Sequence, residues 1–462
     1  WVATPLLLLW ALAPTLVWWL SRPGRARRPH LEQEERLFLR AVARRTWRFF
    51  ETYVAKEDHY LPPDNFQEEP PRGAAHRTSP TNIGMALLAN LTAYDFGYLD
   101  AGAVLERTTL TLDTLDQLER YRGHFYNWYD TSTLKPLLPV YISTVDSGNF
   151  AGHMLTLAVG LQELASHKAF PPECFAGLSD TLQVLSENTP PGAGLRAATS
   201  RIKGLLDKAP DTLGRARVLL DQLSSAAQEL ATLAAAAGKD ELQWWVRAFA
   251  AQVRRARDEL LQLAPWVELG PSDAAGELRE QLERLDGGLT LAETAQLPQT
   301  LGPLFERALT ATKSAALEKL RHAVQRAAAL ASRRLEQLSQ LAARCTAFAD
   351  LDYEFLYQRE RHLLSIGYNV SDHRLDASVY DLLASEARLC SFVAIAQGKL
   401  PQEHWFSLGR QLTTWGGKPT LLSWSGSMFE YLMPLLVMPT YEQTLLDETY
   451  QRADEQQNAY GK

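Results

Sequence analysis

Three observations predict an all-α fold for this chain of 462 residues. Apolar residues recur at helical spacing in long segments throughout the sequence. Almost no segment alternates polar with apolar residues, which is the pattern of a half-buried strand. Loops rich in aromatic residues, proline and glycine separate the helical segments, and helices joined in this way are typical of proteins without a large sheet.

Residues 1–20 carry no charge and are predicted to form a transmembrane helix. Twenty helical residues rise about 30 Å, the thickness of the hydrocarbon core of a bilayer. Trp18 and Trp19 suit the membrane interface. A buried helix is the alternative. A signal peptide fits less well, because no positive charge precedes the apolar run and no cleavage site follows it.

Residues 21–30 form a basic juxtamembrane linker with four arginines, Arg22, Arg25, Arg27 and Arg28. Positive charge marks the cytoplasmic side of a membrane, so the residues after about 30 are expected to be cytoplasmic. The sequence begins at Trp1 rather than at methionine, and we expect it to be a piece of a longer protein.

Residues 31–165 combine helices with two long aromatic loops. Residues 31–54 and 83–99 are predicted helices, and residues 60–82 between them contain five prolines, which favour irregular backbone. A second aromatic loop precedes a helix that is expected to begin after a turn at residues 146–148. The apolar positions of the first helix are Leu37, Leu39, Val42, Trp47 and Phe50.

Residues 166–345 are predicted to be a helical insert, either a bundle or a coiled-coil-like arm. The segment is rich in alanine, leucine, glutamine, glutamate and arginine and has few aromatic residues. We expect a structural role, because apolar stripes at helical spacing are usually core. The two clearest stripes are Leu219, Leu223, Ala226, Leu230 and Leu233, and Val324, Ala327, Ala331, Leu335, Leu338 and Ala342.

Residues 346–462 return to aromatic loops and short helices, with helices predicted over residues 377–398 and 429–437.

Composition limits the function of the whole chain. A net charge of −7 argues against a nucleic-acid partner. The three cysteines form no CxxC pair, which argues against a disulfide scaffold or a cysteine-rich zinc site and suits a reducing compartment. No HExxH motif or phosphate-binding glycine loop is present, so neither a metal nor a cofactor is predicted.

Glu386 is the first candidate catalytic residue. Its helix is expected to turn Leu382, Leu383 and Leu389 toward a core, and a carboxyl in apolar surroundings has a raised pKa that suits a proton donor. The alternative is a surface glutamate paired with Arg388.

Two further loops contain candidate substrate-binding residues. Asp372, His373, Arg374 and Asp376 resemble the rim of a site, although one of the acidic residues or Ser371 is expected to cap the next helix. Trp424 and Glu430 flank a flexible Ser-Gly-Ser step that can approach a ligand closely. For Glu430 the favoured alternative is a capping box with Ser427.

A third set of residues suggests carbohydrate binding. Flat aromatic rings stack on pyranose rings, while amide, carboxylate and guanidinium groups bind the hydroxyls. The alternative is ordinary loop packing with satisfied turn residues. The set comprises Arg77, Asn82, Tyr126, Asn127, Trp128, Asp130 and Asp146.

Several long strings, in this order, resemble cyclic β-1,2-glucan synthases, which are large proteins of the bacterial inner membrane. They are LPPDNFQE, AHRTSPTNIG, YDFGYL, RYRGHFYNWYD, STVDSGN, SIGYNVSDHRLDASVYDLLASEARL, HWFSLGR and LLSWSGSMFEYLMP. The resemblance covers about residues 31–165 and 346–451, and residues 1–20 resemble the last membrane segment of that family.

The resemblance implies an (α/α)6 toroid of the glycoamylase-like type. Residues 31–165 would be its first part and 346–462 its second, truncated part, with the insert between them. It also implies anomer-retaining transglycosylation that closes linear β-1,2-glucan into a ring. The implied partners are the glucan chain, the membrane through residues 1–20, and the remaining regions of the synthase, namely a UDP-glucose-dependent transferase and a phosphorylase-like part.

The resemblance implies that Glu386 is one of the two catalytic glutamates of the family; we expect it to be the acid/base, and the nucleophile is the alternative role. The family's second glutamate lies in a PWGISES-like string, which this sequence does not contain. We therefore expect an internal fragment that is inactive alone. Two alternatives remain open: a non-catalytic glucan-binding or scaffold protein, and an endo-β-1,2-glucanase that uses water as acceptor.

Overall fold

The computed structural model describes residues 3–20, 31–190, 193–238, 240–269, 274–415 and 417–461. The chain divides into two compact units. The larger unit contains residues 33–352 and 367–374, and the smaller unit contains residues 1–32, 353–366 and 375–462. The predicted division at residues 165 and 345 stays a prediction.

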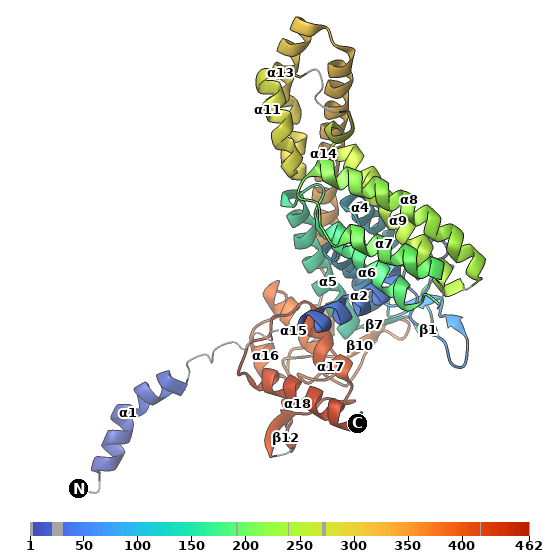
Figure 1. Cartoon of the computed structure of the whole chain (residues 1–462). Coiled ribbons are helices and arrows are strands. Elements are labelled where there is room, and N and C mark those ends of the chain that lie inside the picture. Colours follow the sequence, from blue (N-terminus) through green and yellow to red (C-terminus); the bar gives the residue numbers. More distant parts are fainter. Residues whose placement is uncertain are drawn as a thin grey trace. The chain divides into compact units, whose positions relative to one another are not determined.

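Helices dominate the described residues (Figure 1). Those of the larger unit are α2 (Gln33–Tyr53), α3 (Pro80–Asp95), α4 (Ala101–Leu115), α5 (Thr144–Glu163), α6 (Glu173–Glu187), α7 (Ala193–Leu206), α8 (Leu213–Ala237), α9 (Asp240–Leu263), α10 (Trp266–Leu269), α11 (Gly276–Arg284), α12 (Leu291–Ala295), α13 (Leu297–Thr312) and α14 (Ala315–Phe348). Those of the smaller unit are α1 (Thr4–Leu20), α15 (Ala387–Ala396), α16 (Glu403–Ser407), α17 (Met428–Leu432) and α18 (Leu445–Tyr460).

The strands are two to four residues long and pair locally, so they form no large sheet among the described residues. The larger unit has β1 (Phe66–Gln67), β2 (Gly73–Ala74), β3 (Arg77–Thr78), β4 (Arg120–Tyr121), β5 (His124–Phe125), β6 (Tyr129–Asp130), β7 (Tyr141–Ser143) and β10 (Gly367–Asn369). The smaller unit has β8 (Tyr357–Gln358), β9 (Leu363–Leu364), β12 (Leu412–Trp415) and β13 (Lys418–Leu421), and β11 (Arg374–Leu375) lies at the boundary.

The predicted transmembrane helix over residues 1–20 is wrong. The helix α1 has 17 residues, with Pro14 inside it. It rises about 25 Å, less than the roughly 30 Å of a bilayer core. Among the described residues, no helix combines the length and apolar character needed to cross a membrane. The predicted fold class is therefore corrected to a mostly helical chain in which this span is not supported. The basic linker of residues 21–30 lies outside the described residues, and the cytoplasmic placement stays a prediction.

The helices α3 and α5 of the larger unit pack closely against each other. Both helices begin with a serine N-cap: Ser79 Oγ accepts from the backbone of Asn82, and Ser143 Oγ accepts from the backbone of Asp146. The helices approach closely because each contributes a glycine. A Cβ on Gly84 would lie 2.4 Å from His153 Nδ1, and one on Gly160 would lie 2.2 Å from Leu91 Cδ2. The close approach therefore fixes the first turns of α3 and α5 relative to each other.

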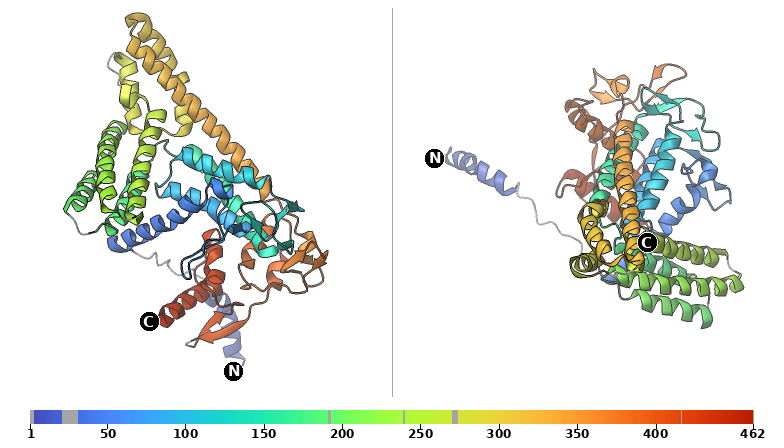
Figure 2. Two further views of the ribbon diagram at one scale, coloured as in Figure 1. Left: turned by 90° about the vertical axis from the view of Figure 1, so that its right-hand side faces the viewer. Right: turned by 90° about the horizontal axis from the view of Figure 1, so that it is seen from above.

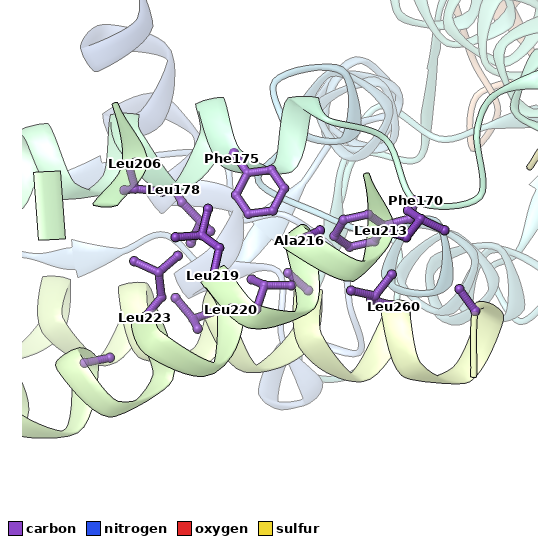
Figure 3. Packing of buried hydrophobic residues seen from close by; sticks show 14 of the residues in the cluster. Phe170, Phe175, Leu178, Leu206, Leu213, Ala216, Leu219, Leu220, Leu223 and Leu260 are labelled. Atoms are coloured by element: carbon purple, nitrogen blue, oxygen red, sulfur yellow. The ribbon is translucent and has the colours of Figure 1, made fainter. Parts of the chain in front are cut away.

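The helices α6 to α9 pack side by side (Figures 1 and 2). Their facing sides bury one hydrophobic cluster, which includes Leu220 and Leu223 of α8, Phe175 of α6 and Leu260 of α9 (Figure 3). The first predicted apolar stripe lies on α8, and the second lies along α14. Nearly all residues of both stripes are buried. Each Å² of apolar surface that these helices remove from water contributes about 25 cal/mol to the free energy of unfolding.

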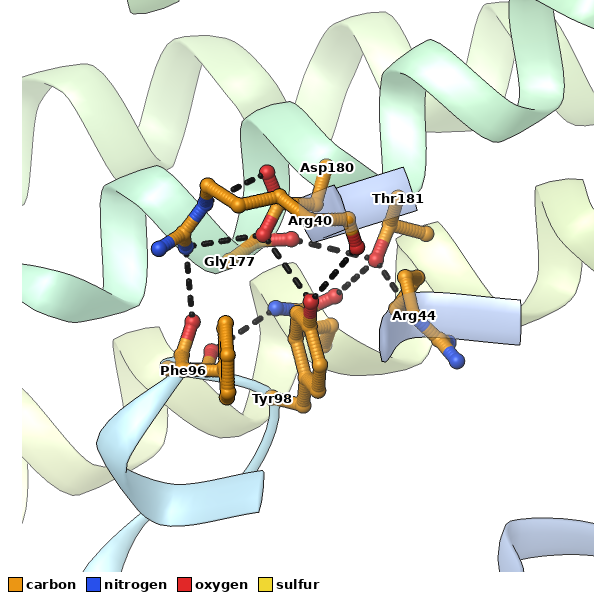
Figure 4. Close-up of polar contacts among 9 residues, drawn as sticks. Arg40, Arg44, Phe96, Tyr98, Gly177, Asp180 and Thr181 are labelled. Atoms are coloured by element: carbon orange, nitrogen blue, oxygen red, sulfur yellow. Dashed lines mark hydrogen bonds and ion pairs between the residues drawn. The ribbon is translucent and has the colours of Figure 1, made fainter. Parts of the chain in front are cut away.

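A buried polar network joins α2 to α6 (Figure 4). Arg40 lies 2.8 Å from Asp180 Oδ2, and Tyr98 donates its hydroxyl to the same carboxylate atom at 3.0 Å. Arg44, which is 1% exposed, donates to Thr181 Oγ1 at 2.7 Å. A second buried ion pair joins α9 to α14, where Arg334 Nη2 donates to Glu259 Oε2 at 2.8 Å.

The smaller unit has its own core, which includes Leu382, Leu383, Leu421 and Tyr450. The predicted helix over residues 377–398 begins only at Ala387. Ser385 has a φ of 51°, a left-handed conformation that a right-handed helix does not contain. The leucines before it are buried as predicted, but from a loop rather than from a helix.

Candidate active site

The first turn of α5 carries the candidate site of the larger unit. Asp146 lies inside the helix, not in a turn before it, because Ser143 caps the helix and Thr144 is its first residue. Thr81, in the first turn of α3, donates its hydroxyl to Asp146 Oδ1 at 2.6 Å. Asn149 Nδ2 donates to Thr81 Oγ1 at 3.1 Å. Burial raises the pKa of Asp146, although hydrogen bonds from Ser143 and Thr81 act to lower it.

The aromatic loop reaches Asp146 through Asn127. In the amide orientation that satisfies both neighbours, Asn127 donates to Asp146 Oδ2 at 3.0 Å and accepts from Trp128 Nε1 at 3.2 Å. The guanidinium carbon of Arg77 lies 4.9 Å from the centre of the Trp128 ring. This arrangement places an aromatic ring, a cation, an amide and a carboxylate next to one another; their role in substrate binding stays a prediction.

Asp64 completes this cluster and was not predicted. It pairs with Arg77 at 2.9 Å and accepts from Asn82 Nδ2 at 3.3 Å. Its position in the proline-rich loop, directly after Pro62 and Pro63, is the only sequence signal that could have suggested it. We refer to Asp64, Arg77, Thr81, Asn82, Asn127, Trp128 and Asp146 as the Asp146 cluster.

Tyr126 and Asp130 lie in the same loop but have structural contacts. Tyr126 is 9% exposed, and its backbone donates to the Tyr129 hydroxyl at 2.8 Å. Asp130 Oδ1 accepts from the backbone of Thr133 at 2.8 Å and from the backbone of Ser132 at 3.0 Å, as in a turn. These bonds lower the pKa of Asp130.

The charged loop of residues 372–376 does not cap a helix. Asp372 accepts from Asn369 Nδ2 at 3.0 Å and lies 3.9 Å from Arg374. His373 is exposed with a φ of 51°, and the Asp376 carbonyl accepts from Ser365 Oγ at 2.7 Å. The expected N-cap among these residues is wrong, because the next helix begins at Ala387 and Glu386 occupies its N-cap position.

Glu386 is buried in the smaller unit, with 6% of its surface exposed. Ser385 Oγ donates to Glu386 Oε2 at 2.8 Å. The alternative of a solvated surface glutamate is therefore wrong. The left-handed backbone of Ser385 costs about 1–2 kcal/mol, and such strain is commonest at functional sites.

Glu430 accepts hydrogen bonds from two segments, Ser385 beside Glu386 and residues 425–427. It is 4% exposed and accepts from the backbone of Ser385 at 3.0 Å and from Ser425 Oγ at 2.7 Å. The capping box with Ser427 is present, as predicted. Burial acts to raise the pKa of Glu430, but the hydrogen bonds from Ser425 and Ser385 outweigh it and lower the pKa. Ser385 therefore joins the two glutamates, because its hydroxyl binds one and its backbone binds the other.

Arg388 and Trp424 border the two glutamates. Arg388 is 1% exposed, and its Nη1 donates to the Glu430 carbonyl at 2.6 Å, while Nη2 donates to the Tyr431 carbonyl. Trp424 is 54% exposed, and its Nε1 donates to Asp381 Oδ2 at 3.2 Å. An exposed ring held at its nitrogen can offer a face to a sugar.

Comparisons with known proteins give one match along the whole chain. The chain is 34% identical over 467 residues to the cyclic β-(1,2)-glucan synthase NdvB of Rhizobium meliloti strain 1021. The match covers 100% of this chain and 15% of that protein. No protein-family model matches the chain.

One solved structure is also similar in part. It is assigned as a glucoamylase from Bacteroides fragilis NCTC 9343, with a TM-score of 0.26 and 20% identity over 36% of this chain and 38% of that one. At this score the likeness says nothing about whether the helices form a toroid. The whole-length identity, by contrast, confirms the resemblance seen in the motifs: this chain is similar from end to end to one segment of a cyclic β-1,2-glucan synthase.

Proposed function

We propose that this chain is the part of a cyclic β-1,2-glucan synthase that closes linear β-1,2-glucan into a ring. The 34% identity with such a synthase along the whole chain carries the proposal. Two local arrangements support it. Glu386 is a buried carboxyl next to strained backbone, and the Asp146 cluster combines groups that bind sugar hydroxyls with an aromatic ring.

In the proposed reaction Glu386 acts as the acid/base of a retaining transglycosylation. It donates a proton to the oxygen of the glycosidic bond that breaks, so that the sugar segment on the reducing-end side of this bond leaves with that oxygen as a hydroxyl, while a second carboxylate bonds to the anomeric carbon. The hydroxyl at the far end of the same glucan then attacks this carbon and gives its proton to Glu386, and the second carboxylate leaves. No water enters the product.

The second carboxylate is not assigned to a residue of this chain. Glu430 fits poorly as the nucleophile, because its oxygens already accept from Ser385, Ser425 and Ser427. We assign it instead the task of holding Ser385, and through Ser385 the position of Glu386. The resemblance assigns the second carboxylate to a string outside this sequence, in the remaining regions of the synthase.

The proposal is tested in a synthase that contains this chain, with linear β-1,2-glucan as substrate and mass spectrometry of the products. A ring is one water lighter than the linear chain with the same number of sugars. Glu386→Gln should slow ring formation by about 100-fold or more, the usual contribution of a general acid/base. Retardation on a glucan-containing gel should remain, because the Asp146 cluster is unchanged.

Glu442→Gln is the matched control, because Glu442 is an exposed glutamate of the same unit. Normal ring formation by the Glu386→Gln protein would refute the assignment. Shortened linear products in place of rings, from the unchanged synthase, would instead favour an endo-β-1,2-glucanase. Glucan binding without any product would favour a non-catalytic glucan-binding protein.

A further inference from the structure

Asn149 is a fully buried amide beside the Asp146 cluster. It lies in α5, three residues after Asp146, with 0% of its surface exposed. Its Nδ2 donates to Thr81 Oγ1, but no group among the described residues donates to its Oδ1. A buried acceptor without a donor destabilises the folded state. A leucine has nearly the same size and would avoid this cost, so the value of the amide lies in its donor end.

The Thr81 hydroxyl can satisfy its two neighbours in only one way. It has a single hydrogen to donate, and it lies 2.6 Å from Asp146 Oδ1 and 3.1 Å from Asn149 Nδ2. If the oxygen of the Asn149 amide faced Thr81, two acceptors would compete for that hydrogen. Because the NH2 group faces it instead, the hydroxyl accepts from Asn149 and donates to Asp146.

A second chain of hydrogen bonds ends at the other oxygen of Asp146. The indole Nε1–H of Trp128 can only donate, so the amide oxygen of Asn127 faces it at 3.2 Å. The NH2 group of Asn127 then faces Asp146 Oδ2 at 3.0 Å. The direction of this chain is set by Trp128, just as the direction of the first chain is set by Asn149.

Both side-chain oxygens of Asp146 therefore accept hydrogen bonds. Such bonds stabilise the charged form of a carboxyl and oppose the burial that raises its pKa. The nearby charged groups Asp64 and Arg77 pair with each other at 2.9 Å. His153 lies one turn after Asn149, and burial lowers its pKa to about 4, so its ring is neutral at physiological pH.

We propose that Asn149 and Trp128 are positioning residues that hold Asp146 as an ionised acceptor for hydroxyl groups of the glucan. The first acts through Thr81 and the second through Asn127. The inference rests on the proposed function, because it takes a linear β-1,2-glucan as the ligand. It divides the work between two carboxyl groups: Asp146 receives hydrogen bonds from the substrate, and Glu386 donates the proton.

Infrared titration of Asp146 in the full chain tests the inference without any glucan. A protonated carboxyl has a C=O stretching band that a carboxylate lacks, and the band of Asp146 is identified by its loss in Asp146→Asn. Asn149→Leu should move the midpoint of this titration upward by about one pH unit, which corresponds to about 1.4 kcal/mol. Trp128→Phe keeps an aromatic ring but loses the indole N–H, and it should also move the midpoint upward.

A double variant separates the positioning role from a merely structural one. Thr81→Val removes the hydroxyl through which Asn149 acts and should itself raise the midpoint. Adding Asn149→Leu to Thr81→Val should then cause no further shift, because residues that act through one another are not additive.

Thr108→Val is the matched control. Thr108 is a buried threonine of α4 whose hydroxyl binds no other described residue, so this variant should leave the midpoint unchanged. Circular dichroism spectra establish that the variants are folded, and Asn149→Ala replaces Asn149→Leu if the leucine variant does not fold.

Glucan binding is measured on the same variants by retardation on a gel that contains linear β-1,2-glucan. The unchanged chain should lose retardation as the pH falls through the Asp146 midpoint. Asn149→Leu should lose it at a pH about one unit higher, in step with its infrared titration. Thr108→Val should follow the unchanged chain.

The outcomes separate this inference from the proposed function. An unchanged midpoint in Asn149→Leu, or an equal further shift when it is added to Thr81→Val, would overturn the inference and leave the proposed function standing. Retardation that does not follow the Asp146 midpoint would overturn the role of Asp146 as the acceptor for glucan. Failure of the unchanged chain to bind any linear β-1,2-glucan would refute the proposed function as well, whatever the midpoints show.

Discussion

The two units each hold a carboxyl that is surrounded by hydrogen-bond donors, yet the environments shift the two pKa values in opposite directions. Asp146 accepts from Thr81 and Asn127, and burial still raises its pKa. Glu430 accepts from the backbone of Ser385, from Ser425 and from Ser427, and its pKa is lowered although it is 4% exposed. Loss of solvent is the largest influence on both pKa values: at Asp146 it prevails over the hydrogen bonds, whereas at Glu430 the hydrogen bonds prevail over it. Glu430 is thus suited to a permanent structural charge, and Asp146 to a group whose protonation responds to its surroundings.

The largest effect is expected from removing the charge at Glu430. Glu430→Gln leaves the backbone N–H groups of Ser385 and Ser425 with a weaker acceptor or none. We expect a loss of about 3 kcal/mol or more in the free energy of unfolding, because bonds to a charged group contribute about 1.5–3 kcal/mol each. Urea unfolding of this variant and of Glu442→Gln measures the difference. Equal stability of the two variants would contradict the structural role of Glu430.

The pH dependence sharpens the comparison. Glu430 has a lowered pKa in the folded state, so its stabilisation is present above the unfolded value of 4.5 and is lost as the pH falls through the folded pKa. Asp146 has a raised pKa, so its contribution is complete below 3.8 and is lost as the pH rises through the folded pKa.

The free energy of unfolding of wild type minus that of Asp146→Asn should therefore fall as the pH rises above 3.8. Wild type minus Glu430→Gln should instead rise as the pH increases toward 4.5. Unfolding in urea at a series of pH values measures both differences. Slopes of the same sign would mean that the two environments do not differ as described.

The smallest effect concerns the residue that joins Glu386 to Glu430. Ser385→Ala loses the hydroxyl bond to Glu386 and keeps the strained φ of 51°. Ser385→Gly loses the same bond but adopts this φ without strain. We expect the glycine variant to be more stable than the alanine variant by about 1 kcal/mol. A glycine variant less stable than the alanine variant would show that the backbone at Ser385 is not strained.

Sequence patterns predicted best those structural features, such as helices and their caps, that depend on residues close together in the sequence. The period of apolar residues predicted α2, and the serine followed three residues later by a glutamate predicted the capping box at Ser427. The position of α15 could not be predicted in the same way. Residues 377–386 have helical spacing, but the left-handed Ser385 and its bonds to two glutamates come from tertiary contacts.

The candidate site was predicted by residue type and only partly by position. Arg77, Asn82, Asn127, Trp128 and Asp146 come together because their loops end at the first turns of α3 and α5. Asp64 was missed because an aspartate after two prolines is common in turns, whereas its contacts with Arg77 and Asn82 depend on the tertiary structure. The transmembrane prediction failed because it rested on the apolar composition of residues 1–20 and gave no weight to Pro14, and because the helix starts only at Thr4.

The long helix α14 can carry a small tilt at one of its ends to a larger displacement at the other end. It has 34 residues and is therefore about 51 Å long. Its last turn is wedged between aromatic rings, with Phe348 next to Phe125 and Phe150, while its first half packs on α13. A tilt of one degree at the wedged end moves the opposite end by about 1 Å over that length. A spectroscopic label on α13 would therefore report, as a larger displacement, small changes in the packing of α5 beneath Asp146.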